Sequence, residues 1–66
     1  MKQQTIEDMI DVGATPSEAK RAEAIWEMLR PGLRIKSNGR VDTAGGDKTK
    51  LGLYRSILRV IEEVER

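Results

Sequence analysis

The sequence predicts a small α+β domain in which two helices, a β-hairpin and a third helix follow one another (ααββα). Three observations lead to this prediction. Apolar residues recur with helical spacing before residue 30 and after residue 48, and they alternate with polar residues between 33 and 43. An Asn38-Gly39 pair lies inside the alternating stretch, where it favours a hairpin turn. We expect all 66 residues to form a single domain.

The first helix is predicted over residues 5–12. Thr5 is suited to cap it, acidic residues follow in the first turn, and Gly13 is suited to end it in a left-handed conformation. A helix of about two turns is marginal by itself, so it needs a neighbouring surface to pack on.

The second helix is predicted over residues 16–30. Thr15 as the cap, Pro16 at the first helical position and Glu18 three residues after the cap form a capping-box pattern. The following Pro31-Gly32 ends the helix. Its apolar stripe is expected to consist of Ala19, Ala22, Ile25, Trp26 and Leu29.

The hairpin is predicted over residues 33–43, and its register can be argued. A two-residue Asn38-Gly39 loop would place Ile35 opposite an aspartate and mix the two faces. A three-residue loop ending in a left-handed Gly39 places Ile35 opposite Val41 and keeps one face apolar, which favours that register.

The last helix is predicted over residues 48–65, with Asp47 or Thr49 as its cap. Gly52 is costly in the first turns of a helix, and close packing or a ligand approaching the backbone would each explain it. The main apolar face is expected to consist of Leu53, Tyr54, Ile57, Val60, Ile61 and Val64, with Leu51 and Leu58 at its side.

The composition limits the kinds of site that the chain can build. It has no Cys and no His, which excludes disulfides and the common zinc and iron–sulfur ligand sets, and no stretch resembles a calcium loop. Oxygen-only sites for magnesium or calcium stay open, but no pattern in the sequence points to one, so we expect no metal, no cofactor and no catalytic residues. A core this small needs tight packing or self-association, so a monomer and a homodimer both stay open. No signal peptide or membrane span is recognisable, which predicts a cytoplasmic protein that does not enter the membrane.

The net charge of +1 hides a strong segregation along the chain. Residues 1–29 carry a net charge of −3, residues 30–59 carry +6 and residues 60–66 carry −2. The register argued above also places Lys36 directly opposite Arg40, a pairing that costs stability unless solvent or an anion screens it.

This basic segment predicts a nucleic-acid-binding surface, with DNA preferred because no exposed aromatic residue is expected for base stacking. The ribbon would enter a groove while the start of the last helix holds phosphates. The candidate residues are Arg34, Lys36, Asn38, Arg40, Lys48, Lys50 and Arg55. The hypothesis requires these side chains to converge on one patch.

Two other interpretations stay open. The basic residues can be a solvated face that protects an edge strand, and the chain can be a protein-interaction module that binds and modulates a partner protein. The stretch "GGDKTK" is not a phosphate-binding loop, because Asp47 stands where that motif needs glycine. We expect no enzymatic activity from a chain this short without His or Cys.

Overall fold

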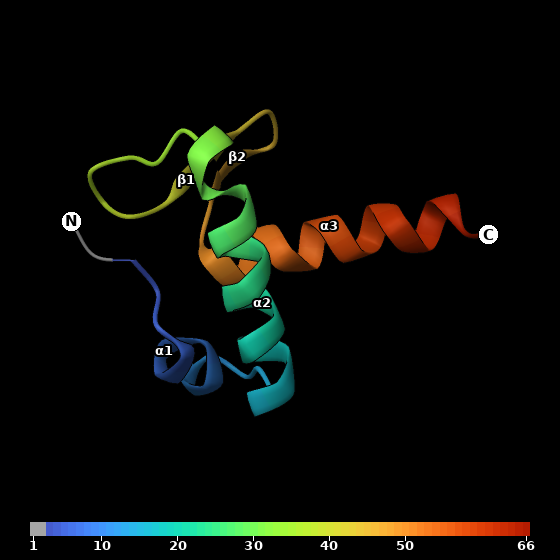
Figure 1. The fold of residues 1–66 in the computed structure, drawn as a ribbon, viewed down its shortest axis with the longest axis horizontal. Helices are drawn as coiled ribbons and strands as arrows, with labels where there is room; N and C mark the ends of the chain where they lie inside the picture. Colours follow the sequence, from blue (N-terminus) through green and yellow to red (C-terminus); the bar gives the residue numbers. More distant parts are fainter. Residues whose placement is uncertain (1–2) are drawn as a thin grey trace.

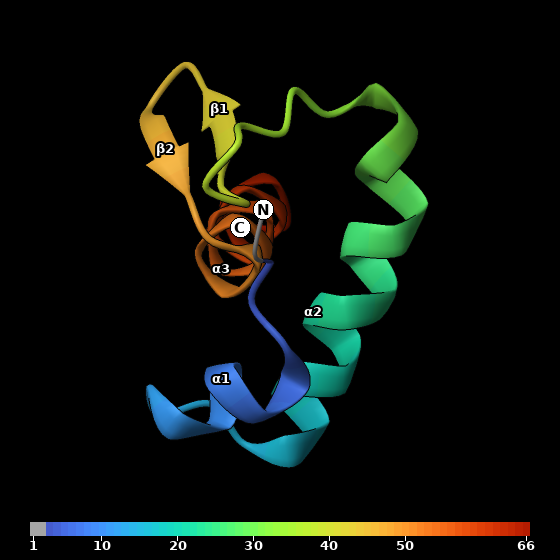
Figure 2. The ribbon, with the colours of Figure 1, turned by 90° about the vertical axis from the view of Figure 1, so that its left-hand side faces the viewer.

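The computed structural model describes residues 3–66, and its elements follow the predicted order ααββα in one small domain. The elements are α1 (Ile6–Asp11), α2 (Pro16–Leu29), the 3-10 turn η1 (Arg30–Gly32), β1 (Val41–Thr43), β2 (Gly46–Lys48) and α3 (Lys50–Val64). Figure 1 shows α1 beside the start of α2, while α3 crosses α2 and runs out to the side with the C-terminus at its tip. In Figure 2, where α3 is seen end-on, the hairpin lies above α3 and α2 lies beside it.

Helix α1 begins with a complete capping box. The Thr5 hydroxyl accepts the Asp8 N–H at 3.1 Å, and the Asp8 carboxylate accepts the Thr5 N–H at 3.0 Å. Two amides at the helix start are thereby satisfied. Gly13, with a φ of 108°, ends the turn after the helix, as predicted. The helix is held to the domain by Met9, which is fully buried.

Helix α2 has the predicted cap but lacks the reciprocal half of the capping box. The Thr15 hydroxyl accepts the Glu18 N–H at 3.1 Å, and Pro16 occupies the first helical position. The Glu18 carboxylate instead binds Arg55 of α3. The helix ends at Leu29, one residue earlier than predicted, because the following Pro31 lies in the tighter turn η1.

The hairpin lies further along the chain than residues 33–43. The two strands pair antiparallel with Val41 opposite Lys48, and the stretch before them contributes only one isolated bridge, between Ile35 and Val41. The first predicted strand is short because η1 still holds the Leu33 N–H, which donates to the Arg30 carbonyl at 3.1 Å. Strand β1 pairs with β2 along one edge, while on its other edge the Asp42 N–H donates to the Arg34 carbonyl at 2.9 Å.

The predicted register is confirmed around the first turn. The bridge joins Ile35 to Val41, and the Gly39 N–H donates to the Lys36 carbonyl at 2.9 Å. Gly39 has a φ of 83°, which is the left-handed conformation that a three-residue loop requires.

Helix α3 is capped by Thr49, whose hydroxyl accepts the Gly52 N–H at 3.2 Å. Asp47 lies in β2 and is not the cap. A Cβ on Gly52 would stand 3.3 Å from the Thr49 hydroxyl and 3.9 Å from the Cβ of Lys48. Close packing at the helix start therefore explains the glycine.

The core lies where α3 crosses the first two helices. The alanines of α2 allow α3 to approach closely, and Trp26 is 1% exposed. The main buried cluster consists of Met9, Ala14, Ala19, Ala22, Leu51 and Tyr54, with Ile6, Ile25 and Leu58 packed around it. Within residues 3–66, no helix combines the length and the apolar character that crossing a membrane requires.

Candidate functional site

The pairing pattern divides the predicted basic residues between two faces of the ribbon. Ile35, Val41 and Lys48 lie in one row across the three extended segments, so their side chains share the face that turns toward the helices. The next row consists of Arg34, Asp42 and Asp47, and its side chains point to the opposite face. Together with Lys36 and Arg40 beside the first turn, they form what we call the outer face of the ribbon. The outer face thus holds three cations together with two carboxylates.

Lys36 is engaged by one of those carboxylates. Its Nζ lies 2.8 Å from Asp47 Oδ2, and this hydrogen bond raises the pKa of Lys36 above its usual value, with the nearby charges of Asp47 and Asp42 adding to the rise. Asn38 is also used within the fold, since its side-chain oxygen accepts the Arg40 N–H at 3.0 Å. Both side chains therefore stabilise the ribbon and its turn.

Lys50 is not available to a phosphate. Its side chain is 5% exposed, its Nζ lies 2.6 Å from Glu23 Oε2, and it sits 5.6 Å from the centre of the Trp26 ring. The ammonium is held between a carboxylate and an aromatic face of α2, which is a structural position.

Arg55 is likewise neutralised by α2. Its guanidinium binds the Glu18 carboxylate through two hydrogen bonds, of 3.2 Å from Nε and 3.0 Å from the second nitrogen, Nη2. The hydrogen bond with Arg55 is the main cause that holds the pKa of Glu18 below its usual value, and it raises the pKa of Arg55. The two-pronged contact fixes how α3 lies across α2.

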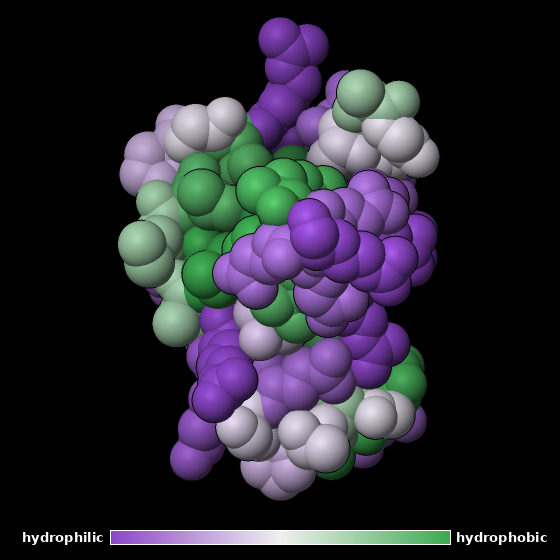
Figure 3. All heavy atoms as spheres, turned by 90° about the vertical axis from the view of Figure 1, so that its right-hand side faces the viewer, coloured by the Kyte–Doolittle hydropathy of each residue, from purple (hydrophilic) through white to green (hydrophobic). Residues whose placement is uncertain are grey.

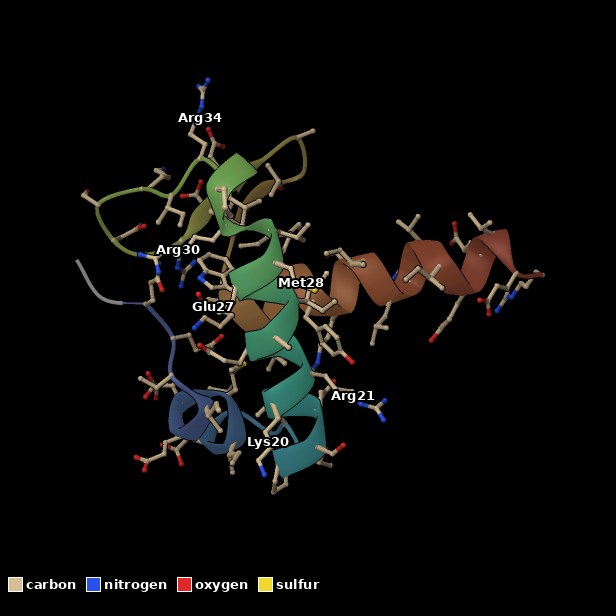
Figure 4. All side chains as sticks on the ribbon, in the orientation of Figure 1. Lys20, Arg21, Glu27, Met28, Arg30 and Arg34 are labelled. Atoms are coloured by element: carbon tan, nitrogen blue, oxygen red, sulfur yellow. The ribbon has the colours of Figure 1, made fainter. Side chains whose placement is uncertain are left out.

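Three predicted cations have no ion pair within the described residues 3–66, namely Arg34, Arg40 and Lys48. Arg34 points outward from the hairpin end of the molecule (Figure 4). Arg40 lines a shallow groove with Asp8 and the N-terminal residues Gln3 and Gln4. Lys48 is half-buried on the opposite face of the ribbon, against α3. The seven predicted residues therefore do not converge on one basic patch.

The sequence also led to an incorrect expectation about α3. Of the face expected to be its main apolar contact, only Tyr54 is buried, and the core is instead reached by Leu51 and Tyr54, with Leu58 packed against them. The other members of that face form what we call the outer face of α3, which consists of Leu53, Ile57, Val60, Ile61 and Val64. Three of them are strongly exposed: Val60 by 61%, Ile61 by 46% and Val64 by 79%.

The outer face of α3 borders a groove of about 320 Å³. Its lining is almost wholly apolar and consists of Thr43, Lys48, Leu53, Ser56, Ile57, Val60 and Ile61. Figure 3 looks at the molecule from the side of the C-terminus and shows apolar surface gathered next to the polar tip of the chain. The groove joins the hairpin to the projecting helix, and together with the exposed Val60, Ile61 and Val64 it forms a continuous stretch of uncovered apolar side chains.

The signals that sequence reasoning missed lie in the lengths and faces of the helices. Helix α3 has apolar residues as far as Val64, yet α1 and α2 are placed to cover it only as far as Leu58. Glu18 and Glu23 flank the alanine stripe of α2, so any helix packed on that stripe meets their carboxylates.

The described residues contain no group of three or more His, Cys, Asp or Glu side chains that could hold a metal ion. Comparisons of the chain with models of protein families, with curated proteins and with solved structures found no match.

Proposed function

We propose that this chain is a protein-interaction module that holds its partner along the outer face of α3. The observation that carries the proposal is the exposed apolar face on a helix that projects from the domain. Contiguous apolar surface of this kind on a small protein is typical of an interaction site. In this proposal the protein works in the cytoplasm, as its sequence predicts.

The length of α3 supports this proposal. The residues after Leu58 extend beyond the part of the helix that packs on the core, and most of the stability of a protein helix comes from packing of its apolar face. A partner that covers Val60 and Val64 would supply that packing.

The free energy that burial of the outer face of α3 can contribute to binding is moderate. Full burial of an aliphatic side chain contributes about 1.5–3 kcal/mol, and covering about half of the five side chains of the outer face therefore offers roughly 5 kcal/mol. A partner with a similar face would contribute a comparable amount. The total is of the same order as the cost of association, which points to a reversible complex.

Site-specific photo-crosslinking tests this proposal. A photoreactive residue at position 60 should give a protein adduct in nuclease-treated lysate, whereas the same residue at position 12 should not. Val12 is a matched control, because it is 63% exposed but lies away from α3, at the end of α1. Equal adducts at both positions, or no adduct at position 60, would contradict the proposal.

Nucleic-acid binding is the second candidate, and the observation in its favour is the pair Arg34 and Arg40 on the outer face of the ribbon. Both are exposed and have no ion pair within residues 3–66. Asp42 and Asp47 share that face, however, so it offers only about two or three phosphate contacts. A plot of the logarithm of the binding constant against the logarithm of the salt concentration should then have a slope of about −2 to −3.

A titration of labelled duplex DNA at several salt concentrations tests the second candidate. Arg34→Glu with Arg40→Glu should abolish binding. Lys20→Glu with Arg21→Glu is the control, because both side chains lie on α2 and point away from the hairpin (Figure 4). Binding that is equally weakened by both pairs would reflect only the overall charge and would contradict a ribbon site.

A further inference from the structure

The outer face of α3 has a spacing that suits a second helix. Leu53, Ile57, Val60 and Val64 follow one another at intervals of four, three and four residues, which is the spacing of the buried seam of a two-stranded coiled coil. The intervals read the same from either end of the helix. Two copies can therefore pair with their α3 helices antiparallel, so that Leu53 lies against Val64 of the second copy and Ile57 lies against its Val60.

We propose that the occupant of this face is a second copy of the chain, whose α3 lies antiparallel to the first. This inference rests on the proposed function and names the partner. The seam alone permits a parallel pairing as well, so the direction must be argued from the residues that flank it.

The flanking charges favour the antiparallel direction. The segment that leads into α3 supplies Lys48 without an ion pair in the described chain, and the first half of α3 carries no acidic residue, whereas the last turns carry Glu62, Glu63 and Glu65 beside Arg66. A parallel pair would place acidic ends together and basic starts together. An antiparallel pair places each acidic end beside the other copy's basic start, which also opposes the two helix dipoles.

The small residues on one flank give this pairing a specific contact. Gly52 and Ser56 border the seam on the same side as Glu63, and in the antiparallel pairing Glu63 of the second copy lies level with the gap between them. The Lys48 side chain begins beside this gap, since its Cβ is 3.9 Å from the place of a Gly52 Cβ. Its stem lines the apolar groove, and its Nζ lies at the hairpin turn, 3.7 Å from the place of a Gly45 Cβ. In the dimer the Lys48 side chain turns from the hairpin turn toward Glu63 of the other copy, and this contact forms twice.

The shape of the molecule is compatible with this arrangement. Helix α3 has its domain at one end and its tip at the other (Figure 1), so an antiparallel pair places the two domains at opposite ends of the seam. A parallel pair would place both domains side by side at the same end, while packed helices are only about 8–10 Å apart.

Sedimentation equilibrium on the full chain, from about 10 µM to 1 mM, measures the association. We expect a monomer–dimer equilibrium that Val60→Glu weakens at least tenfold, because the change removes an apolar contact twice in the dimer. Val12→Glu should leave it unchanged. Circular dichroism should show that both variants keep the wild-type helix content, as expected for exposed positions.

Charge reversal and disulfide trapping test the direction. Lys48→Glu should weaken dimerisation, and Lys48→Glu with Glu63→Lys should restore it. The natural chain has no cysteine, so single cysteines can be introduced cleanly. An equimolar mixture of Leu53→Cys and Val64→Cys chains should oxidise to the mixed dimer, whereas a parallel pair would give disulfides within each variant.

The outcomes separate this inference from the proposed function. A monomer up to 1 mM, combined with a position-60 adduct to a different protein, overturns the second copy as occupant and leaves the interaction module standing. A monomer with no adduct at position 60 overturns both. Dimerisation that Val60→Glu does not weaken, or same-variant disulfides, contradicts the antiparallel seam.

Discussion

Replacing Lys50 tests whether it belongs to the core or to a ligand surface. Lys50→Ala removes three nearly buried methylenes, at about 0.8 kcal/mol each, and this loss amounts to about 2 kcal/mol. The lost contact with Glu23 adds about 1 kcal/mol, a value reduced because that carboxylate is 33% exposed and can be rehydrated. We therefore expect unfolding to become easier by about 3 kcal/mol.

That loss is large for a chain of this size, whose total stability is on the order of 3–10 kcal/mol. Lys50→Met keeps the apolar stem over Trp26 and should cost only about 1 kcal/mol. Lys20→Ala, an exposed change on α2, should stay within about 0.5 kcal/mol of the natural chain.

Urea unfolding, followed by the fluorescence of the single Trp26, measures these differences. A cost for Lys50→Ala below about 0.5 kcal/mol would show that the side chain is not held in the core. Equal costs for the alanine and methionine variants would refute the division between packing and charge.

Two further predictions concern a surface ion pair and a turn. Because Arg55 lowers the pKa of Glu18 in the folded chain, the pair stabilises the fold above the usual carboxyl pKa of 4.5, and the contribution is lost as the pH falls through the lowered value. Arg55→Gln should return the Glu18 pKa toward 4.5 in a carbon-13 NMR titration, and Arg59→Gln should not. Gly39→Ala should destabilise the fold by about 1 kcal/mol in urea unfolding, because alanine resists a φ of 83°.

Each of these has a clear contrary result. A Glu18 pKa that stays low in Arg55→Gln would mean that another group sets it. For the turn, Gly32→Ala is the control, since Gly32 has no positive φ and a Cβ there meets nothing within 4 Å. Equal stabilities of the two glycine variants would contradict the left-handed turn.

Local signals in the sequence were sufficient to predict most of the fold. Thr15 and Pro16 fix the start of α2, and Gly39 fixes the first turn, because caps and left-handed glycines depend on residues close in the chain. The pairing of Val41 with Lys48 was missed because Val41 can pair with a segment on either side of it. The bridge to Ile35 is local and was predicted, but the ladder to Lys48 depends on the turn at residues 44–45.

The candidate site was harder to predict because charge along a sequence does not show which charges become paired. Lys50 and Arg55 looked like parts of a basic patch, yet each meets a carboxylate of α2 when the helices cross. These contacts join residues 27 and 37 positions apart. The exposure of Val60 also depends on contacts between distant elements, because α1 and α2 cover α3 only as far as Leu58.

The N-terminal segment is hydrogen-bonded to both α3 and α2. The Leu51 N–H donates to the side-chain oxygen of Gln4 at 2.9 Å, and the Gln3 side-chain oxygen accepts the Trp26 ring N–H at 3.3 Å. Gln4 and Leu51 are 47 positions apart, so this amide is protected only while the beginning of the chain stays docked. Hydrogen exchange at Leu51 thus reports detachment of the N-terminal segment, even though Leu51 lies in a different element.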